Sequence, residues 1–150
     1  MMLEKLLQDK VLLQKQLFWI KISFDECLLI GIKAEYSVEE FGKFETLCSR
    51  YSRGIDFLIR KIFRTLDEYE FENQGTLVDV VNNAHKRGLF NDIEMLRIMK
   101  DVRNTVVHEY IEDDLVDVFD EVLQYSSKLI DIINNTLLYI DAKCLNNENH

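Results

Sequence analysis

The sequence predicts an all-α protein, an up-and-down bundle of four longer helices and one short helix in a single domain over residues 1–150. Three observations favour this fold class. The 150 residues contain no proline and only five glycines, and proline is the residue that most strongly interrupts helices. Apolar residues recur at steps of three and four rather than in strict alternation. They make up 47% of the chain, which is sufficient for one hydrophobic core at this length.

The first two helices are predicted from their apolar faces. The first is expected from about Leu3 to about Lys33, with a face formed by Leu3, Leu6, Leu7, Leu13, Leu17, Ile20, Phe24, Cys27 and Leu28. Ser37 and Glu40 match a capping box that begins the second helix. The second face consists of Phe41, Phe44, Cys48, Tyr51, Ile55, Leu58, Ile62 and Leu66. This helix is expected to fade in the acidic stretch 67–72.

A turn is expected at residues 73–75, followed by the short third helix. Thr76 is the predicted N-cap, and the helix is expected from Leu77 to Arg87. Gly88 follows two cations, which is typical of a glycine placed directly after the last turn of a helix.

The fourth and fifth helices are predicted in the same way. Asn91, with Glu94 three residues later, indicates a capping box for a fourth helix that ends near Tyr110. Its apolar stripe is Met95, Met99, Val102 and Val106, with Leu96 beside it. Asp113 or Asp114 is expected to cap the fifth helix, whose apolar face runs from Val118 to Ile140. The polar tail begins near residue 144, and residues 146–150 are expected to fray.

The cysteines and the hydropathy of the sequence indicate the cellular compartment in which the protein is expected. Cys27, Cys48 and Cys144 are far apart and form no Cys-x-x-Cys pair, so neither a disulfide framework nor a zinc site is expected. The N-terminus lacks the pattern of a secretory signal, and no uncharged apolar run approaches the length of a membrane span. A cytoplasmic protein without membrane contact is therefore expected.

The formal net charge of −9 counts against nonspecific nucleic-acid binding, because such affinity comes from lysine and arginine neutralising phosphates. The charges are unevenly placed, however. Residues 43–64 hold six cations against Glu45 and Asp56, and a second basic group comprises Lys86, Arg87, Arg97, Lys100 and Arg103. Residues 109–121 are acidic. A basic cleft on an acidic body would bind phosphate through a local field, although for any single charge an ordinary solvated face is the better interpretation.

One constellation could carry chemistry: Arg103-Asn104-Thr-Val-Val-His108-Glu-Tyr110, at the end of the fourth helix. Arginine binds phosphate oxygens with a fork of donors, and histidine exchanges protons near neutral pH. Asn104 could orient the ring of His108, and the Tyr110 phenol could donate to a phosphate or stack on a base. The sequence places no carboxylate cluster with metal-ligand spacing beside them, so a reaction without a metal ion or other cofactor is expected.

Helix geometry separates the two central residues of this motif. Arg103 and Tyr110 are seven residues apart and share a helix face, whereas Arg103 and His108 lie about 140° apart around an ideal helix and about 7.5 Å apart along it. One straight helix would not aim both at one atom. They could converge if the end of the helix loosens or if a second subunit forms the other wall of the cleft.

The motif resembles the Arg-x4-His-x-Tyr pattern of the HepT branch of the HEPN superfamily, with Arg103, His108 and Tyr110 at its three positions and Asn104 as the polar residue that follows the arginine. Residues 44–50, Arg64, residues 75–79 and residues 87–89 resemble the order of features in such proteins. The likeness covers about residues 40 to 140. The first helix fits the fold less specifically.

The resemblance implies a homodimeric, metal-independent endoribonuclease, the toxin of a type VII-like HepT/MntA toxin–antitoxin pair. His108 would be the general base or acid, and Arg103 would stabilise the charge on the transition state. The RNA products would carry a 2′,3′-cyclic phosphate and a 5′-OH. An MntA-like nucleotidyltransferase antitoxin of the MNT type would transfer AMP to Tyr110, and the bulky anion would block RNA.

Other interpretations remain open at this stage. The chain could be a non-catalytic HEPN-like module that binds a nucleotidyltransferase partner or a nucleotide, or a structural bundle without nucleotide chemistry. Cations near a helix C-terminus interact favourably with its dipole, which alone could explain Arg103, His108 or His85. Phe18, Trp19 and Tyr51 are expected to be core or dimer-interface residues rather than base-stacking platforms.

Overall fold

The computed structural model describes residues 2–70 and 75–148, and within these residues the protein is all-α, as predicted. The elements are α1 (Met2–Ile30), α2 (Val38–Phe57), the π-helical turn η1 (Leu58–Ile62), α3 (Phe63–Tyr69), α4 (Leu77–Lys86), α5 (Ile93–Glu112), the 3-10 turn η2 (Leu115–Val118) and α6 (Phe119–Glu148). None of the helices in this part of the chain is both long and apolar enough to cross a membrane. The turn expected at residues 73–75 falls mostly outside the described residues.

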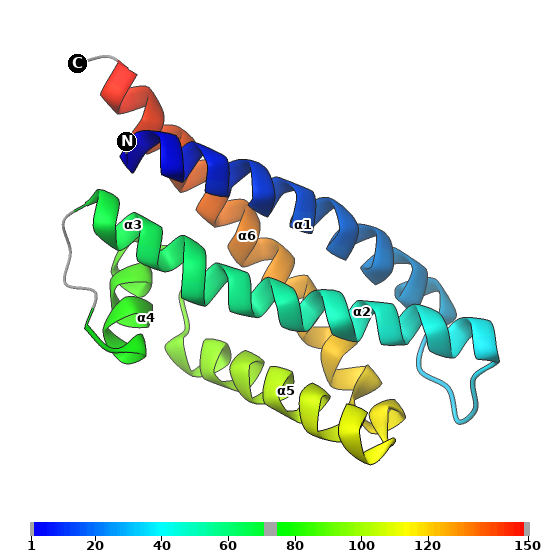
Figure 1. The fold of residues 1–150 in the computed structure, drawn as a ribbon. Helices are drawn as coiled ribbons and strands as arrows, with labels where there is room; N and C mark the ends of the chain where they lie inside the picture. The colour runs from blue at the N-terminus through cyan, green and yellow to red at the C-terminus, as the bar shows by residue number, and fades with distance from the viewer. Residues whose placement is uncertain (1, 71–74, 149–150) are drawn as a thin grey trace.

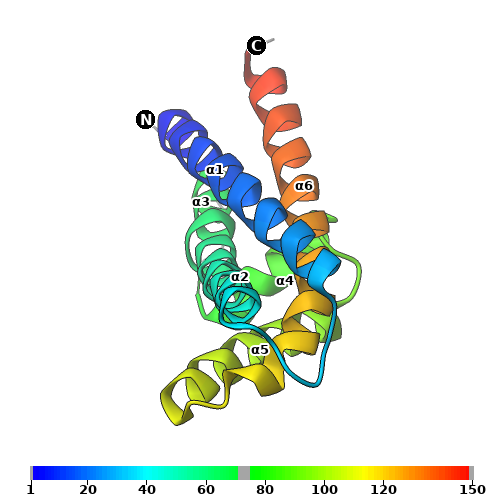
Figure 2. The same ribbon diagram turned by 90° about the vertical axis from the view of Figure 1, so that its right-hand side faces the viewer.

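The helices form a bundle in which α2 occupies the centre. In Figures 1 and 2, α1 lies along one side of the rod formed by α2 and α3, and α5 lies on the opposite side. Helix α6 packs against both α1 and α2, and the short α4 lies between α3 and α5. The buried apolar side chains form one cluster that draws on all of these helices. As a result, α2 presents one face to α1 and another to α5.

Helix α1 begins and ends close to the expected residues. It ends at Ile30 rather than Lys33, because Gly31 adopts a left-handed conformation with φ of 74° and donates its N–H to the Cys27 carbonyl at 2.9 Å. Cys27 is buried, as is Cys48 of α2, so these members of the predicted apolar faces are small core residues. Burial raises the pKa of each thiol to about 12.

The second predicted helix is present as one continuous rod, α2–η1–α3, and the Ser37–Glu40 capping box is confirmed. The sequence did not predict the π-helical turn within it. The N–H of Phe63 donates to the carbonyl of Leu58, five residues back instead of four. The wider turn buries Leu58, Ile59, Ile62 and Phe63 together. Helix α3 then continues to Tyr69, into the stretch where fading was expected.

The capping predictions for the later helices are partly wrong. Thr76 caps α4 as expected, and Gly88 follows it with φ of 78°. Helix α5, however, is capped by Asp92 and not by Asn91: the Asp92 carboxylate accepts the N–H groups of Glu94 and Met95. A capping box and a simple Asp cap give similar sequence patterns when two cap-forming residues are adjacent.

The turn between α5 and α6 also differs from the prediction. Asp113 ends α5 in a left-handed conformation, with φ of 62°, rather than beginning the next helix. Asp114 precedes the 3-10 turn η2 and makes no side-chain cap hydrogen bond, and α6 begins only at Phe119. Helix α6 then continues through Glu148, so the fraying expected from residue 146 is wrong for the part of the tail that the structure describes.

Side chains of α1 and α6 pack closely against α2 at Gly54. A methyl group at its Cα would lie 2.9 Å from Ile20 Cδ1 of α1 and 3.1 Å from Leu129 Cδ2 of α6. Those distances are too short for carbon–carbon contact, so the absence of a side chain at position 54 lets α1 and α6 pack directly on the backbone of α2.

Replacing Gly54 with valine is therefore expected to destabilise the protein by about 1–3 kcal/mol, because the side chain would displace both neighbours in a close-packed core. The matched control is Gly42→Ala in the same helix, where the added methyl group meets nothing within 4 Å. That change is expected to stabilise by about 0.5–1 kcal/mol through helix propensity. Urea denaturation of both variants measures the two effects. Equal effects would contradict the close packing at Gly54.

A buried ionic cluster joins α3, α4 and α6. Arg87 Nη1 lies 2.8 Å from Asp67 Oδ1, and its Nε donates to Glu70 Oε1 at 2.6 Å. The Tyr139 hydroxyl donates to Glu70, and Lys143 approaches the same carboxylate at 3.3 Å. Asp67 is fully buried and Arg87 nearly so. Arg87 thus belongs to the interior and not to the basic surface group in which the sequence placed it.

Candidate functional site

Helix α5 carries the whole motif in regular α-helical conformation and continues two residues beyond Tyr110. The loosening of the helix end that could have brought Arg103 and His108 together is therefore not present. Tyr51 of α2 holds α5 in position, since its buried hydroxyl donates to the Met99 carbonyl at 2.8 Å. The two central motif residues remain separated around one helix, as their spacing of five predicts.

Arg103 forms a bidentate ion pair with Asp56 of α2. Its Nε lies 3.0 and 3.2 Å from the two carboxylate oxygens, and its Nη2 lies 2.7 Å from Oδ2. The third nitrogen, Nη1, donates to Asn104 Oδ1 at 3.4 Å. Both ionic partners are partly exposed. The guanidinium is thereby fixed in orientation, with Nη1 the nitrogen that makes the weakest contact and so the most available to another anion.

Arg103 lines a groove of about 590 Å³ between α2 and α5. Helix α2 contributes two further cations, Arg50 and Arg53, and the hydroxyl groups of Ser49 and Ser52. Helix α5 contributes Tyr110 and an apolar wall of Val106, Val107 and Ile111. Arg60 and Lys100 lie around a smaller hollow on the other side of Arg103 and Asp56. Two acids, Glu45 and Asp56, also line the groove, and Asp56 is paired with Arg103. The three cations outnumber the acids and lie beside hydroxyl donors and an aromatic ring, which suits a phosphate-bearing ligand.

Arg103 and Tyr110 meet in this groove, but His108 does not line it. The His108 side chain is 68% exposed, and its Nε2 lies 3.8 Å from Glu109 Oε1. Within the described residues no hydrogen bond joins Asn104 to His108; Asn104 accepts from Arg103 instead. In a single chain the structure therefore places Arg103 and Tyr110 in one groove. Asn104 contacts Arg103 beside a smaller hollow, and His108 lies on a neighbouring face of the helix.

The surroundings of His108 are acidic. The turn after α5 brings carboxylate oxygens of Glu109, Asp114 and Asp117 within 4.8 Å of one another. This corrects the expectation that no carboxylate cluster with metal-ligand spacing lies beside the motif, because the left-handed residue Asp113 folds the chain back. Two of these three acids are exposed. Negative charge here, added to the negative end of the α5 dipole, disfavours a phosphate beside His108 of an isolated chain.

Large apolar side chains are exposed around the end of α5. Tyr110 is 64% exposed, and Val107, Ile111 and Val116 are also exposed. Val107, Tyr110 and Ile111 lie within three residues of His108 in the sequence and form part of the groove wall, whereas Val116 lies outside its lining. An exposed apolar group of this kind at the rim of a polar groove is typical of an interaction surface.

Sequence reasoning missed the α2 side of the groove. Arg50 and Arg53 were recognised only as members of a basic segment, and Asp56 only as one of its two acids. Because Asp56 and Arg103 are 47 residues apart, no local pattern could pair them. The available signal was weak: Asp56 is one acid between the cations Arg53 and Arg60 of a basic segment.

Fold and groove together define an all-α bundle with a cationic groove that contains the arginine and tyrosine of the motif. Comparisons of the chain with protein-family models, with curated proteins and with solved structures found no match. The resemblance to HEPN proteins therefore depends on the sequence alone, and chiefly on the motif residues.

Proposed function

We propose that this protein is a metal-independent endoribonuclease that acts as a homodimer and is the toxin of a HepT/MntA-like pair. The observation that carries the proposal is the position of Arg103: the motif arginine is oriented by Asp56 within a groove that also presents Arg50, Arg53 and Tyr110. A groove of this charge on a chain of net charge −9 concentrates phosphate locally.

The chemistry follows from the residue types. A ribose 2′-OH gives its proton to His108 as its oxygen bonds to the adjacent phosphorus, and the bond from phosphorus to the 5′ oxygen breaks. That 5′ oxygen leaves as a hydroxyl after protonation, and the phosphorus remains as a 2′,3′-cyclic phosphate. Arg103 stabilises the added negative charge on the phosphate oxygens. The nucleophile belongs to the RNA, so no metal-bound water is needed.

A second copy of the chain completes the site in this proposal. His108 lies outside the groove of its own chain, among acids, and next to the exposed side chains of Val107 and Ile111. A partner chain that covers these apolar groups would bury them, and its cationic groove, brought toward His108, would offset the negative charge of the acids there. Each catalytic centre would then combine Arg103 of one chain with His108 of the other.

Tyr110 is placed suitably for the proposed modification. Its side chain is exposed and lies at the edge of the groove that contains Arg103. An AMP group on its hydroxyl would add a phosphate beside the cations and fill the groove with a nucleotide. Such an adduct, transferred by a nucleotidyltransferase of the MNT type in the cytoplasm, would exclude RNA by charge and by volume.

The second candidate function is a non-catalytic module that binds a nucleotidyltransferase partner or a nucleotide. The ion pair of Arg103 with Asp56 favours it, because a carboxylate already neutralises the motif arginine. The acids beside His108 favour it as well. In this case the groove would bind its ligand without reaction.

Cleavage of total cellular RNA by the purified protein in the presence of a chelator tests the proposal. His108→Ala is expected to lower the cleavage rate by about 10²–10⁴-fold, and Arg103→Ala by about 10²–10³-fold. Thr105→Ala is the control, since Thr105 is a partly exposed residue of the same helix whose hydroxyl donates to the Asp101 carbonyl. Intact-mass measurement first establishes that the sample carries no AMP.

Two results would overturn the ribonuclease proposal. Equal cleavage by the wild-type protein and by His108→Ala, in an AMP-free sample, would favour the binding module. Cleavage that stops on chelation would instead assign the reaction to a metal ion, for which the carboxylates of Glu109, Asp114 and Asp117 would be the first residues to examine.

A further inference from the structure

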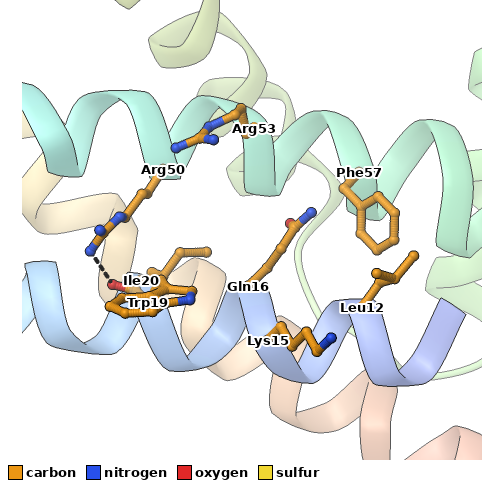
Figure 3. A pocket seen from close by; sticks show the side chains of 8 residues that line it. All are labelled: Leu12, Lys15, Gln16, Trp19, Ile20, Arg50, Arg53 and Phe57. Carbon is orange, nitrogen blue, oxygen red and sulfur yellow. Dashed lines mark hydrogen bonds between the residues drawn. The ribbon is translucent and has the colours of Figure 1, made fainter.

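A second hollow of about 370 Å³ lies between α1 and α2, the two helices that supply its lining residues. Figure 3 shows Trp19 and Arg50 at one end of it, Leu12 and Phe57 at the other, and Gln16 between them. Its volume falls within the range of small-molecule sites, which bind through apolar walls and a few polar groups. Three properties of its lining point to one class of ligand.

The first property is charge. Lys15, Arg50 and Arg53 line the hollow, and no carboxylate is among its described lining residues. None of these three cations forms an ion pair in the part of the chain that the structure describes, in contrast to Arg103. In a chain of net charge −9, three cations without an acidic partner around one hollow form a local site for an anion.

The second property is the aromatic surface. Trp19 keeps 50% of its surface exposed, so of the two roles expected from the sequence, core or dimer interface, the core role is wrong. Arg50 fixes it: the guanidinium lies over the indole at 5.0 Å and donates to the Trp19 carbonyl and to Ser23 Oγ. A tryptophan held in place with half its surface exposed, opposite Phe57, is suited to contact with a planar ring.

The third property is an acceptor without a donor. Gln16 Oε1 is buried and has no hydrogen-bond partner among the described residues. Figure 3 places the Gln16 amide in the middle of the hollow, directed toward α2. A buried carbonyl oxygen without a partner is unfavourable, so a ligand that offers an N–H at this point would bind better than one that does not.

An anionic group, a planar ring and an N–H donor occur together in a nucleotide. We propose that this hollow binds one nucleotide, with its base against Trp19 and a base N–H donating to Gln16, and with its phosphate on Lys15 and Arg53. The same chemistry is offered by a free mononucleotide and by one unit of a single-stranded RNA. The assignment depends only on the lining of the hollow and goes beyond the proposed ribonuclease activity.

The hollow also connects with the groove that contains Arg103, because Arg50 and Arg53 line both. A strand that enters the groove with one phosphate could therefore extend over α2 and seat a neighbouring nucleotide against Trp19. This extension, unlike the nucleotide site itself, rests on the proposed function.

Trp19 is the single tryptophan of the chain, so its fluorescence reports on the hollow directly. AMP and a 2′-O-methyl hexaadenylate, which lacks the 2′-OH needed for cleavage, are titrated against the wild-type protein. We expect saturable quenching by at least one of them. Ribose 5-phosphate and adenosine, which each lack one of the two recognised parts, are expected to bind at least about tenfold more weakly than AMP or the oligomer.

Substitutions then connect the signal to the named contacts. Lys15→Ala and Gln16→Leu are expected to raise the dissociation constant about five- to tenfold. Lys21→Ala, an exposed lysine on α1 outside the lining of the hollow, should leave it unchanged. Circular dichroism confirms that each variant is folded, and Lys15→Ala keeps the test valid should Gln16→Leu fail to fold, because Lys15 is exposed.

The two probes distinguish a site for a free mononucleotide from a site for one unit of RNA. Quenching by AMP supports a mononucleotide site, and quenching by the oligomer alone supports a site for one unit of RNA. No saturable quenching by either would overturn the proposal, as would equal weakening of binding by Lys15→Ala and Lys21→Ala. Because fluorescence does not depend on cleavage, this result is independent of whether His108→Ala loses ribonuclease activity.

Discussion

Replacement of Arg87 by leucine is expected to lower the free energy of unfolding by about 3–5 kcal/mol, since it leaves a buried charge without its partner. Asp67 is fully buried 2.8 Å from the Arg87 guanidinium, and Glu70 bonds to the same group. The leucine fills part of the space but cannot neutralise Asp67. Thermal denaturation should show a fall in Tm of roughly 10 °C for a chain of this length.

Arg97→Leu is the matched control. Arg97 also pairs with a carboxylate, Glu94 at 3.5 Å, but both side chains are exposed. Its loss should therefore change the stability by less than about 1 kcal/mol. Similar effects of the two substitutions would mean that the buried cluster contributes no more than a surface ion pair.

The same cluster gives the expected dependence on pH. Burial raises the pKa of Glu70, but hydrogen bonds from Tyr139, Arg87 and Lys143 outweigh it, so the pKa is lowered overall. A carboxylate with a lowered pKa stabilises the fold above its unfolded pKa of about 4.3, and this contribution is lost as pH falls through its folded pKa. The difference in stability between the wild-type protein and Arg87→Leu should therefore narrow below about pH 4.

Mixing two inactive variants is expected to restore ribonuclease activity, if each centre takes Arg103 from one chain and His108 from the other. In a dimer of one Arg103→Ala chain and one His108→Ala chain, one centre lacks both residues and the other has both. With random pairing, half of the dimers are mixed, so about a quarter of wild-type activity should return. Each variant alone should be lower by at least about 10²-fold. Joint refolding or co-expression provides the mixed sample.

The inverse mixture gives the control. A chain with both substitutions, paired with a wild-type chain, contains no complete centre if the residues act across the interface. It would retain one complete centre if they act within a chain. Excess double variant should therefore suppress the wild-type activity. Failure of the two single variants to restore activity, together with an unsuppressed mixture, would contradict the shared site.

The sequence predicted most of the helices because each carries its own apolar face and most carry recognisable ends. Ser37 was identified as a cap because its partner Glu40 lies three residues away, and Thr76 because it is a cap-forming residue directly before an apolar helical stretch; both interactions are local. The prediction of helix ends failed where two neighbouring residues could each form the cap, or where one residue could cap either of two helices. Asn91 and Asp92 are adjacent cap-forming residues, and Asp113 can either end α5 or begin the next helix, so packing decides between them.

In the candidate site, too, the features within one helix were predicted and those that depend on contacts between helices were not. Helical spacing predicted that Arg103 and Tyr110 share a face and that His108 does not, and the lining of the groove confirms this. The Asp56 ion pair, the α2 cations in the groove and the acids beside His108 depend on contacts between elements, which no periodicity records. Trp19 was expected to be buried or at an interface because large aromatic residues are usually covered, yet Arg50 stabilises it in a half-exposed position.

The π-helical turn at Leu58–Ile62 determines where the length of this chain could change without refolding it. A π turn accommodates one residue more than the α-helical ladder requires. Deletion of one residue here would let the hydrogen bonds return to the four-residue step, while α2 and α3 keep their orientation. The same deletion within α2 would rotate every later side chain of the rod by about 100° and turn its apolar face away from α1 and α6. A relative one residue shorter in this rod would therefore be aligned with its gap at the π turn.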